Sequence, residues 1–397
     1  MGKGHRGPMT AARRTAVLLA VAALALAALL AMVLVVRPGW ARVLFHEVYE
    51  HLAGVDVLGP DAERDPPLDS PYLRWLERAR GAIPVADRGV IGDVTSAALR
   101  PWPQKGEGVS GLYLRLEDEQ VMDARLLELP AGGSTTPERH LYEQGIYFIG
   151  GPGHTVFESP DAPPRRVDWQ EGSLLSIPLN TRYRHFNDAG EPVRLLAVTS
   201  FPFVMNSFDN EAFITGADFA FPERYDGASD YFERERLVAP DWLDTPFVED
   251  IRGAGVADMA IRGAGNRVMH WNMAGNRMLS LHVSEIPPGS YKKAHRHSNG
   301  SAFLLLSGTG YTLAWPARAE HRRQRVDWQP GTFFAPPPYW YHQHFNPGTE
   351  PARYLSINTP DLLKHLGLRF TDQVETRQPD LQRQFERERE EAHRDAQ

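Results

Sequence analysis

The sequence predicts a mainly β protein in which two tandem barrels follow one N-terminal transmembrane helix. Three observations support this fold class. Residues 15–36 form an uncharged apolar run near the start of the 397-residue chain. Downstream, short segments with strand-like alternation are separated by turns, in keeping with 34 glycines and 32 prolines. Two parts of this region also repeat each other closely, which indicates a duplicated structural unit.

The apolar run at residues 15–36 has the length of a transmembrane helix, because about 20 apolar residues span a bilayer. Lysine and arginine residues gather in residues 1–14, so this basic N-terminus is expected to stay in the cytoplasm and the barrels to lie outside it. The alternative is export followed by signal-peptide cleavage. Signal peptides usually have an apolar core of about 7–15 residues and a small-residue cleavage site, so an uncleaved single-pass anchor is favoured.

Residues 37–105 are expected to form a linker and a partly helical arm. In one helical segment Asp69 or Ser70 provides an N-cap, and Pro71 occupies the first turn, where its missing N–H costs nothing. Four apolar side chains then recur at helical spacing and are expected to pack on the first barrel: Tyr72, Leu73, Trp75 and Leu76.

Strand-like alternation begins after this arm and divides the rest of the chain into four parts. The first barrel is predicted at residues 106–205 and the second at residues 276–360. Between them, residues 206–275 are expected to form a connector that wraps one barrel or joins an interface, since a plain loop of this length would be unusual. Residues 361–397 form a charged tail, which is expected to be a solvated helix with Glu–Arg neighbours.

Two repeated sequence segments indicate the two barrels. RVDWQEG at residues 166–172 recurs as RVDWQPG at residues 325–331, and HFN at residues 185–187 recurs at residues 344–346 with the same offset. Such a close repeat means that one structural unit is present twice. Positions that differ between the copies are therefore not needed to build the barrel, which makes the first copy an internal control for the second.

Three histidines of the second copy are placed to bind one metal ion. His295 and His297 are separated by one residue, and alternate side chains of a strand point to the same face, so both rings can enter the barrel. His342 comes from a later strand and can complete the site. Neutral imidazole suits iron, zinc, copper or nickel better than calcium or magnesium. The sequence therefore predicts one divalent metal site in the second barrel.

Two segments around these histidines resemble the signature motifs of the cupin superfamily, whose members are metal-binding jelly-roll barrels built as a double-stranded β-helix. The first segment contains Gly289, His295, His297 and Gly308, and the second contains Gly331, Pro337, His342 and Asn346. In the usual motifs a glutamate stands at the position of Ser301 and a glycine at the position of Tyr339. The missing glutamate implies a ligand set of three histidines alone.

A three-histidine set with the wording HRH and HQHFN resembles the gentisate and salicylate 1,2-dioxygenase type of bicupin, which has two cupin barrels in one chain. The resemblance implies Fe(II) as the most suitable metal, with Mn, Zn or Cu as alternatives, and cleavage of an aromatic ring with O2. A small substrate with adjacent oxygen atoms would bind at the open positions of the metal. Candidate residues of the substrate pocket are Phe303, Tyr311, Trp340 and Tyr341.

The first copy is altered at the ligand positions, which are occupied by Glu138, His140 and Tyr183. These three side chains either bind a hard metal or form a buried hydrogen-bonded cluster. His185 and His344 occupy the same position in both copies, which argues for a role in the barrel fold. For His344 the alternative is a catalytic role beside the metal, as a proton donor to bound substrate.

Composition narrows the classes of function. The net charge of −7 gives no sign of nucleic-acid binding, and the absence of cysteine excludes disulfides, thiolate metal sites and cysteine nucleophiles. The expected partners are a small-molecule substrate and, through the N-terminal helix, a membrane; the oligomeric state stays open. Two alternatives to a dioxygenase remain: a metal-dependent enzyme without redox chemistry, such as an isomerase, hydrolase or decarboxylase, and a non-catalytic module that binds a small ligand.

Overall fold

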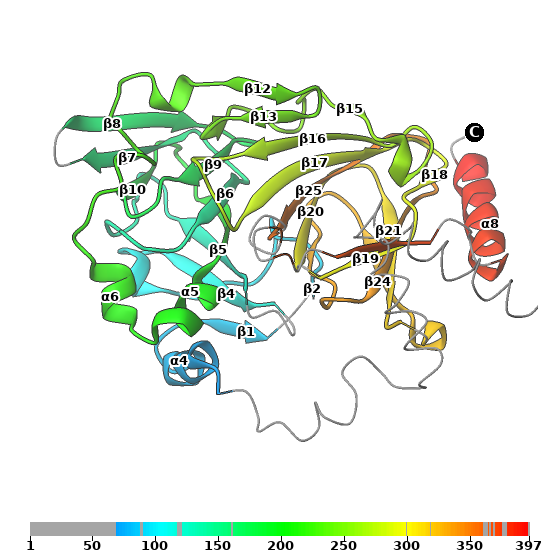
Figure 1. The fold of residues 1–397 in the computed structure, drawn as a ribbon, viewed down its shortest axis with the longest axis horizontal. Helices are drawn as coiled ribbons and strands as arrows, with labels where there is room; N and C mark the ends of the chain where they lie inside the picture. Colours follow the sequence, from blue (N-terminus) through cyan, green and yellow to red (C-terminus); the bar gives the residue numbers. More distant parts are fainter. Residues whose placement is uncertain are drawn as a thin grey trace, which may run out of the picture. The chain divides into compact units, whose positions relative to one another are not determined.

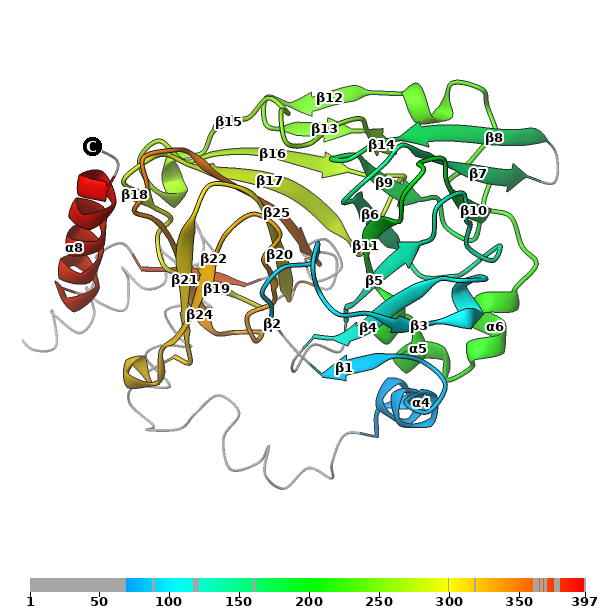
Figure 2. The ribbon, with the colours of Figure 1, turned by 180° about the vertical axis from the view of Figure 1, so that it is seen from behind.

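The computed structural model of the protein describes residues 69–87, 90–116, 121–159, 162–298, 300–317, 319–359, 364, 367, 370–374 and 379–395. The predicted transmembrane segment at residues 15–36 lies outside these ranges. Among the described residues, no helix is long and apolar enough to cross a membrane. The chain from Ser70 onward forms one compact unit, in which two sheet-rich halves lie next to each other (Figure 1, Figure 2).

The first barrel is made of an eight-stranded and a three-stranded sheet. The larger sheet contains β1 (Val85–Asp87), β3 (Arg100–Pro101), β4 (Ser110–Arg115), β5 (Asp123–Leu129), β6 (Gln144–Phe148), β9 (Leu174–Ile177), β11 (Val193–Thr199) and β14 (Phe247–Val248). Its order is β1-β4-β5-β11-β6-β9-β14, with β3 paired to β4. The smaller sheet contains β7 (Gly153–Ser159), β8 (Ala162–Trp169) and β10 (Arg182–Asn187), in the order β10-β7-β8.

The second barrel repeats this plan with a nine-stranded and a six-stranded sheet. The larger sheet contains β2 (Val90–Ile91), β12 (Arg236–Ala239), β13 (Trp242–Asp244), β15 (Ala257–Asp258), β16 (Arg267–Asn272), β17 (Ser280–Ile286), β20 (Ser301–Ser307), β23 (Phe333–Phe334) and β25 (Ala352–Asn358). The smaller sheet contains β18 (Ser290–Tyr291), β19 (His295–His297), β21 (Gly310–Trp315), β22 (Gln324–Trp328), β24 (Tyr341–Asn346) and β26 (Thr371–Gln373). Their orders are β12-β13-β16-β17-β25-β20-β23-β2 and β22-β21-β24-β19-β26.

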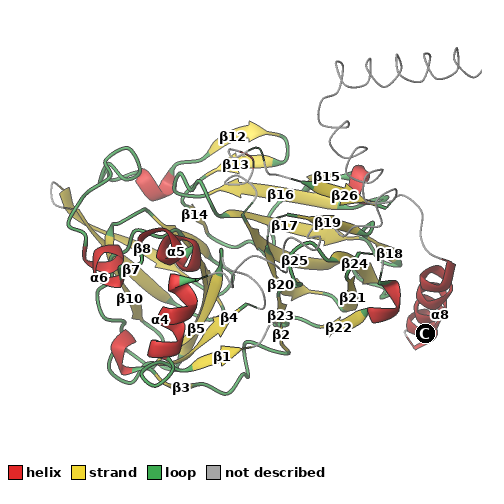
Figure 3. Ribbon diagram, turned by 60° about the horizontal axis from the view of Figure 1, so that its bottom comes forward, coloured by secondary structure: helices red, strands yellow, loops and turns green. Residues whose placement is uncertain are grey.

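Short helices join or cover the sheets. Helix α4 (Pro71–Ala79) begins at Ser70, whose Oγ accepts a hydrogen bond from the backbone N–H of Leu73 at 3.2 Å, so the helix predicted there is confirmed. It packs on α5 (Phe201–Phe208), where the ring centroids of Trp75 and Phe201 are 4.6 Å apart. Within the described ranges the other helices are α6 (Glu211–Gly216), α8 (Pro379–Asp395) and the 3-10 turns η1 (Pro103–Lys105), η2 (Tyr231–Glu233), η3 (Ala260–Arg262) and η4 (Glu320–Arg322). Figure 3 shows α4, α5 and α6 grouped beside the first barrel.

Alternation along the strands gives each large sheet two buried faces. In β5, Leu127 and Leu129 belong to the core of the first barrel, whereas Leu126 joins a cluster that also holds Leu281 of β17. The two barrels therefore pack through the outer faces of their large sheets. Gly145 of β6 leaves room for this contact, because a Cβ there would lie 2.8 Å from Cδ2 of Leu281.

The two halves of the chain exchange short edge strands. Strand β2, from the arm before the first barrel, pairs with β23 of the second, and β14, from the connector, pairs with β9 of the first. Each segment also carries a strand that runs parallel to a strand of the barrel it precedes, β1 beside β4 and β13 beside β16. The expected arm and connector are therefore corresponding parts of the repeat and supply strands to the sheets. Strands of two or three residues are too short to show alternation, so periodicity missed them.

Helix α8 confirms the predicted helix in the tail but corrects its predicted solvation. Leu381 and Phe385 lie one helical turn apart and are only 3% and 1% exposed. They pack with Tyr311 and Phe345 on the outer face of the smaller sheet of the second barrel. This mostly charged helix therefore has an apolar stripe, formed by Leu381 and Phe385, that covers the barrel.

Candidate metal centre

The three histidines predicted as metal ligands converge in the second barrel. His295 and His297 lie on β19, and His295 is directly opposite His342 of β24 in the antiparallel pairing. The ring centroids are 4.4 Å apart for His295 and His342, 4.9 Å for His297 and His342, and 5.8 Å for His295 and His297. One nitrogen of each ring lies within 4.8 Å of the other two, which is close enough to share an ion.

Backbone carbonyls orient two of these rings. Nδ1 of His295 lies 2.8 Å from the carbonyl oxygen of Lys293, and Nδ1 of His342 lies 3.2 Å from that of Trp340. A carbonyl can only accept, so Nδ1 carries the proton and Nε2 keeps its lone pair. Nε2 of His342 is buried and has no hydrogen-bond partner among the described residues. This donor set fits a divalent metal that prefers imidazole.

Burial keeps His295 and His342 neutral. It lowers the pKa of His295 and of His342 well below the usual value of a histidine, and the neighbouring histidines add to this effect. Because only the neutral imidazole offers a lone pair, the fold presents these ligands in the form that binds metal.

A small cavity adjoins the histidines. It is too small to hold a water molecule and is lined by His297, Ser301, Pro336, Pro337, Tyr339, Trp340 and His342. Ser301, which stands where the related motifs have glutamate, has its Oγ 3.4 Å from Nε2 of His297. Tyr339 has a φ of 64° and is 58% exposed. This left-handed conformation explains why glycine is usual at that position.

Two of the four predicted pocket residues lie inside the barrel or at its cavity, and two do not. The ring centroid of Phe303 is 5.0 Å from that of His344, and Trp340 lines the cavity. The prediction for Tyr311 and Tyr341 is wrong, because both belong to the cluster on the outer face, under α8. Each is next to an inward-facing strand residue, so alternation turns it away from the metal ligands.

His344 and His185 have the same hydrogen-bonded setting in both barrels. Nδ1 of His344 lies 2.8 Å from Oγ1 of Thr312, which accepts a hydrogen bond from Nε1 of Trp328 at 3.0 Å. In the first barrel Nδ1 of His185 lies 2.7 Å from Oγ1 of Thr155, which accepts a hydrogen bond from Nε1 of Trp169 at 3.1 Å. This shared arrangement explains why Trp and His recur at the same positions of the two copies, and it supports a role in the barrel fold for both histidines.

His344 also presents a free nitrogen to the interior. The indole N–H can only donate, so the Thr312 hydroxyl accepts from Trp328 and has its own proton for Nδ1 of His344. With Nδ1 accepting from this hydroxyl, Nε2 carries the single N–H of the neutral imidazole. It is buried and has no partner among the described residues. The same residue therefore serves the fold through one nitrogen and can donate to a bound molecule through the other.

The threonine of this arrangement can be tested in the barrel without the histidine triad. Thr155→Val is expected to lower the free energy of unfolding by about 3 kcal/mol, because it leaves both His185 and Trp169 unpaired and each buried unpaired group costs about 1–3 kcal/mol. Urea denaturation measures this loss. Thr155→Ser keeps the hydroxyl and should restore most of the stability; equal losses in both variants would contradict the explanation.

In the first barrel a buried hydrogen-bonded cluster occupies the corresponding ligand positions. Nζ of Lys105 lies 2.6 Å from Oε1 of Glu138, whose Oε2 accepts a hydrogen bond from the hydroxyl of Tyr183 at 3.0 Å. Nε2 of His140 lies 3.1 Å from the same hydroxyl. The Lys105 ammonium thus supplies the positive charge at this place. Among the described residues, no group of His, Asp and Glu close enough to share an ion includes Glu138 or His140.

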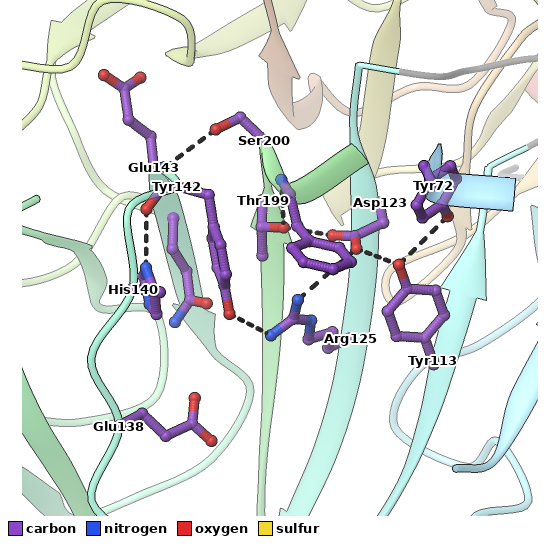
Figure 4. A network of polar contacts seen from close by, with 12 residues as sticks. Tyr72, Tyr113, Asp123, Arg125, Glu138, His140, Tyr142, Glu143, Thr199 and Ser200 are labelled. Carbon is purple, nitrogen blue, oxygen red and sulfur yellow. Dashed lines mark hydrogen bonds and ion pairs between the residues drawn. The ribbon is translucent and has the colours of Figure 1, made fainter. Parts of the chain in front are cut away.

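A second buried ion pair continues this cluster across the first barrel (Figure 4). Arg125 donates to the hydroxyl of Tyr142 at 2.6 Å and lies 3.7 Å from Asp123. Asp123 in turn accepts hydrogen bonds from Tyr113 and Thr199. Lys105 and Arg125 therefore each have a carboxylate partner. Sequence reasoning missed Lys105, Arg125 and Asp123, which carry no motif; the repeat alone could have flagged them as positions that differ between the copies.

The buried His140 predicts a stability that falls in acid. Burial lowers its pKa from 6.5 to about 3 in the folded state, so between these values only the unfolded chain binds the proton. Stability is full above pH 6.5 and falls as the pH drops, by about 2 kcal/mol at pH 5 from this residue. Urea denaturation from pH 7 to pH 4 measures the slope. His140→Gln should flatten it; an unchanged slope would contradict the assignment.

One further group of acidic residues and a histidine lies on the surface of the first barrel. It consists of His154, Asp168 and Asp188. Arg166 pairs with both aspartates, at 2.6 Å and 3.0 Å, and His154 lies 2.7 Å from Asp188. Surface ion pairing accounts for this group without a metal.

Comparisons with known proteins agree with this architecture. Residues 282–358 match the family model described as a cupin domain. The 5-aminosalicylate 1,2-dioxygenase of a Comamonas species is 24% identical over 314 residues, which cover 75% of this chain and 80% of that protein.

Solved structures with a similar chain path include two oxalate decarboxylases. The enzyme from Bacillus subtilis at pH 4.6 is 16% identical with a TM-score of 0.46, covering 69% of this chain and 78% of that one. The formate complex of the enzyme from Lactobacillus farciminis is 13% identical with a TM-score of 0.47, covering 69% and 88%.

Proposed function

We propose that this chain, a bicupin of the cupin superfamily, is an Fe(II)-dependent dioxygenase-like oxidoreductase that acts on a small oxygenated aromatic substrate in its second barrel. The observation that carries the proposal is the convergence of His295, His297 and His342, two of which have Nδ1 held by a backbone carbonyl. The relative named 5-aminosalicylate 1,2-dioxygenase supports the reaction class and suggests a hydroxylated aromatic acid as substrate.

The side chains around the histidines suit this chemistry. Three neutral imidazoles would hold Fe(II), which when bound supplies the means to react an electron-rich ring with O2. Hydrogen bonds to the carbonyls of Lys293 and Trp340 fix two of the rings before any ligand arrives. Phe303 supplies an apolar wall that keeps water from this side of the site. His344 offers an N–H to a substrate oxygen.

Metal analysis and O2 uptake test the proposal together. We expect full-length protein, purified without oxygen, to contain about one Fe per chain and to consume O2 with 5-aminosalicylate, salicylate or gentisate. One Mn or Zn per chain, with no O2 uptake after Fe(II) is supplied, would contradict the dioxygenase and favour a non-redox enzyme. No bound metal after reconstitution would leave a small-ligand binding module.

We also propose that the chain is anchored in a membrane by residues 15–36, with both barrels outside the cytoplasm. The uncharged run and the basic residues before it support this topology. Reporter fusions at the C-terminus would test it, since alkaline phosphatase is active only outside the cytoplasm. N-terminal sequencing of the exported protein distinguishes an intact anchor from a cleaved signal peptide.

A further inference from the structure

Lys292 is a buried cation inside the second barrel. Its side chain is 6% exposed. Nζ donates to the hydroxyl of Tyr354 at 2.7 Å and to Oγ of Ser284 at 3.1 Å. An ammonium group has three N–H donors, so two are satisfied by hydroxyl groups and one has no acceptor among the described residues. The groups that contact this ammonium are therefore polar but uncharged.

No carboxylate in the described part of the chain forms an ion pair with Lys292. A buried charge without a partner is costly, and proteins normally pair it. The first barrel follows this rule, since Lys105 pairs with Glu138 and Arg125 with Asp123. Burial, followed by repulsion from Arg262, lowers the pKa of Lys292 to about 7, in agreement with a missing counter-charge.

The repeat shows that the second barrel has no acidic residue where the first barrel has Asp123 and Glu138. Its strand β17 has Ser280 and His282 where β5 of the first barrel has Asp123 and Arg125. The position of Glu138 is taken by His295, and η3 ends at Arg262 where η1 ends at Lys105. Asp123 and Glu138 thus have no acidic counterpart in the second barrel, whereas Arg262 replaces Lys105 and Lys292 stands in place of Thr135. A metal ion on the three histidines would add further positive charge.

Two more polar atoms of this interior have no partner. Nε2 of His344 and Nδ1 of His282 are both buried without a hydrogen bond among the described residues. His344 is near Tyr354, at 5.1 Å between ring centroids. His282 remains partly exposed, although Leu281 and Val283 on either side of it are fully buried in the contact with the first barrel.

We propose that Lys292, Tyr354 and Ser284 form an anion subsite that binds the carboxylate of a small organic acid inside the second barrel. The subsite lies beyond His344 from the metal ligands, because His344 is next to His342 on one side and Tyr354 on the other, at 5.6 Å and 5.1 Å between ring centroids. Charge-assisted hydrogen bonds from the ammonium would satisfy the third N–H and supply the missing counter-charge. If the proposed function holds, this subsite positions the substrate for reaction at the metal.

Binding of benzoate and acetate to full-length protein tests the subsite by calorimetry and thermal shift. We expect at least one of these acids to bind, benzamide to bind at least tenfold more weakly than benzoate, and removal of the metal by chelation to leave the affinity unchanged. The last result separates the subsite from the metal centre, so it can hold even if the dioxygenase proposal fails. Binding that disappears with the metal, or no binding of either acid, would overturn the subsite.

Variants assign the binding to Lys292. Lys292→Met keeps the length of the side chain and is expected to weaken the binding of the acid at least tenfold without lowering the melting temperature of the free protein, because it removes an unpaired buried charge. Tyr354→Phe should weaken binding several-fold and keeps the ring, which serves if the first variant does not fold. Lys364→Met, which removes an exposed lysine, should bind as the native protein does. Native affinity in both Lys292→Met and Tyr354→Phe would refute the assignment.

Discussion

His342→Ala is expected to empty the metal site and to reduce substrate-dependent O2 uptake to the background rate. The side chain contributes one of three imidazoles, and its Nε2 is buried without another partner. Losing a group that merely orients a ligand lowers metal affinity about 10–100-fold, so losing the ligand itself should lower it by at least about 100-fold. Mass spectrometry of the purified variant measures the metal content per chain.

The first barrel provides the matched control for this substitution. Tyr183 stands at the position that corresponds to His342, and its hydroxyl contacts Glu138 and His140. Tyr183→Phe should leave the metal content at its native value, because the cluster holds its positive charge on Lys105. Native metal content in His342→Ala, or loss of metal in Tyr183→Phe, would show that the ion lies elsewhere.

Lys105→Met is expected to lower the free energy of unfolding by about 3–5 kcal/mol. It leaves the carboxylate of Glu138, which is 18% exposed, without its cation, and breaking a largely buried ion pair on one side costs about this much. Burial alone would raise the pKa of Glu138, but the charge and hydrogen bond of Lys105 outweigh burial and hold the pKa at about 2. Urea denaturation at pH 7 measures the loss.

Two further variants show whether the effect belongs to the pair. Lys105→Met combined with Glu138→Gln removes both charges and should recover a large part of the stability, giving a coupling energy in a double-mutant cycle. Arg139→Met breaks the pair with Asp218, which is 93% exposed, and should change stability by no more than about 1 kcal/mol. A loss in Lys105→Met as small as that in Arg139→Met would contradict the predicted burial cost.

The metal ligands were predictable because their arrangement is local. His295 and His297 share a face through simple strand alternation, and the repeat shows that the same barrel folds without them. Alternation also identifies the error at Tyr341, which is adjacent to His342 and must face outward once that histidine faces inward. The sequence alone therefore predicts that Tyr341 faces away from the pocket, because it is adjacent to His342 on the same strand.

Other features depend on segments that meet only in the folded chain. Lys105 ends a 3-10 turn and reaches Glu138, and Lys292 lies just before β19 and reaches Tyr354 of β25. Lys105 lies in no motif, and Lys292 is one of the five spacer residues between Gly289 and His295, so nothing in the local sequence indicates that either lysine is buried. The exchange of β2 and β14 between the barrels is equally invisible, because two-residue strands acquire their pairing only from the partner sheet.

The sequence by itself determined the two-barrel plan, the intact histidine triad of the second copy and the altered positions of the first. These follow from repeats and from alternation, which act over a few residues. The tertiary structure alone decided which cations are paired, which aromatic rings face the interior and where α8 packs. Such properties depend on the distance between side chains that are remote in the chain, and on the burial that makes an unpaired charge costly.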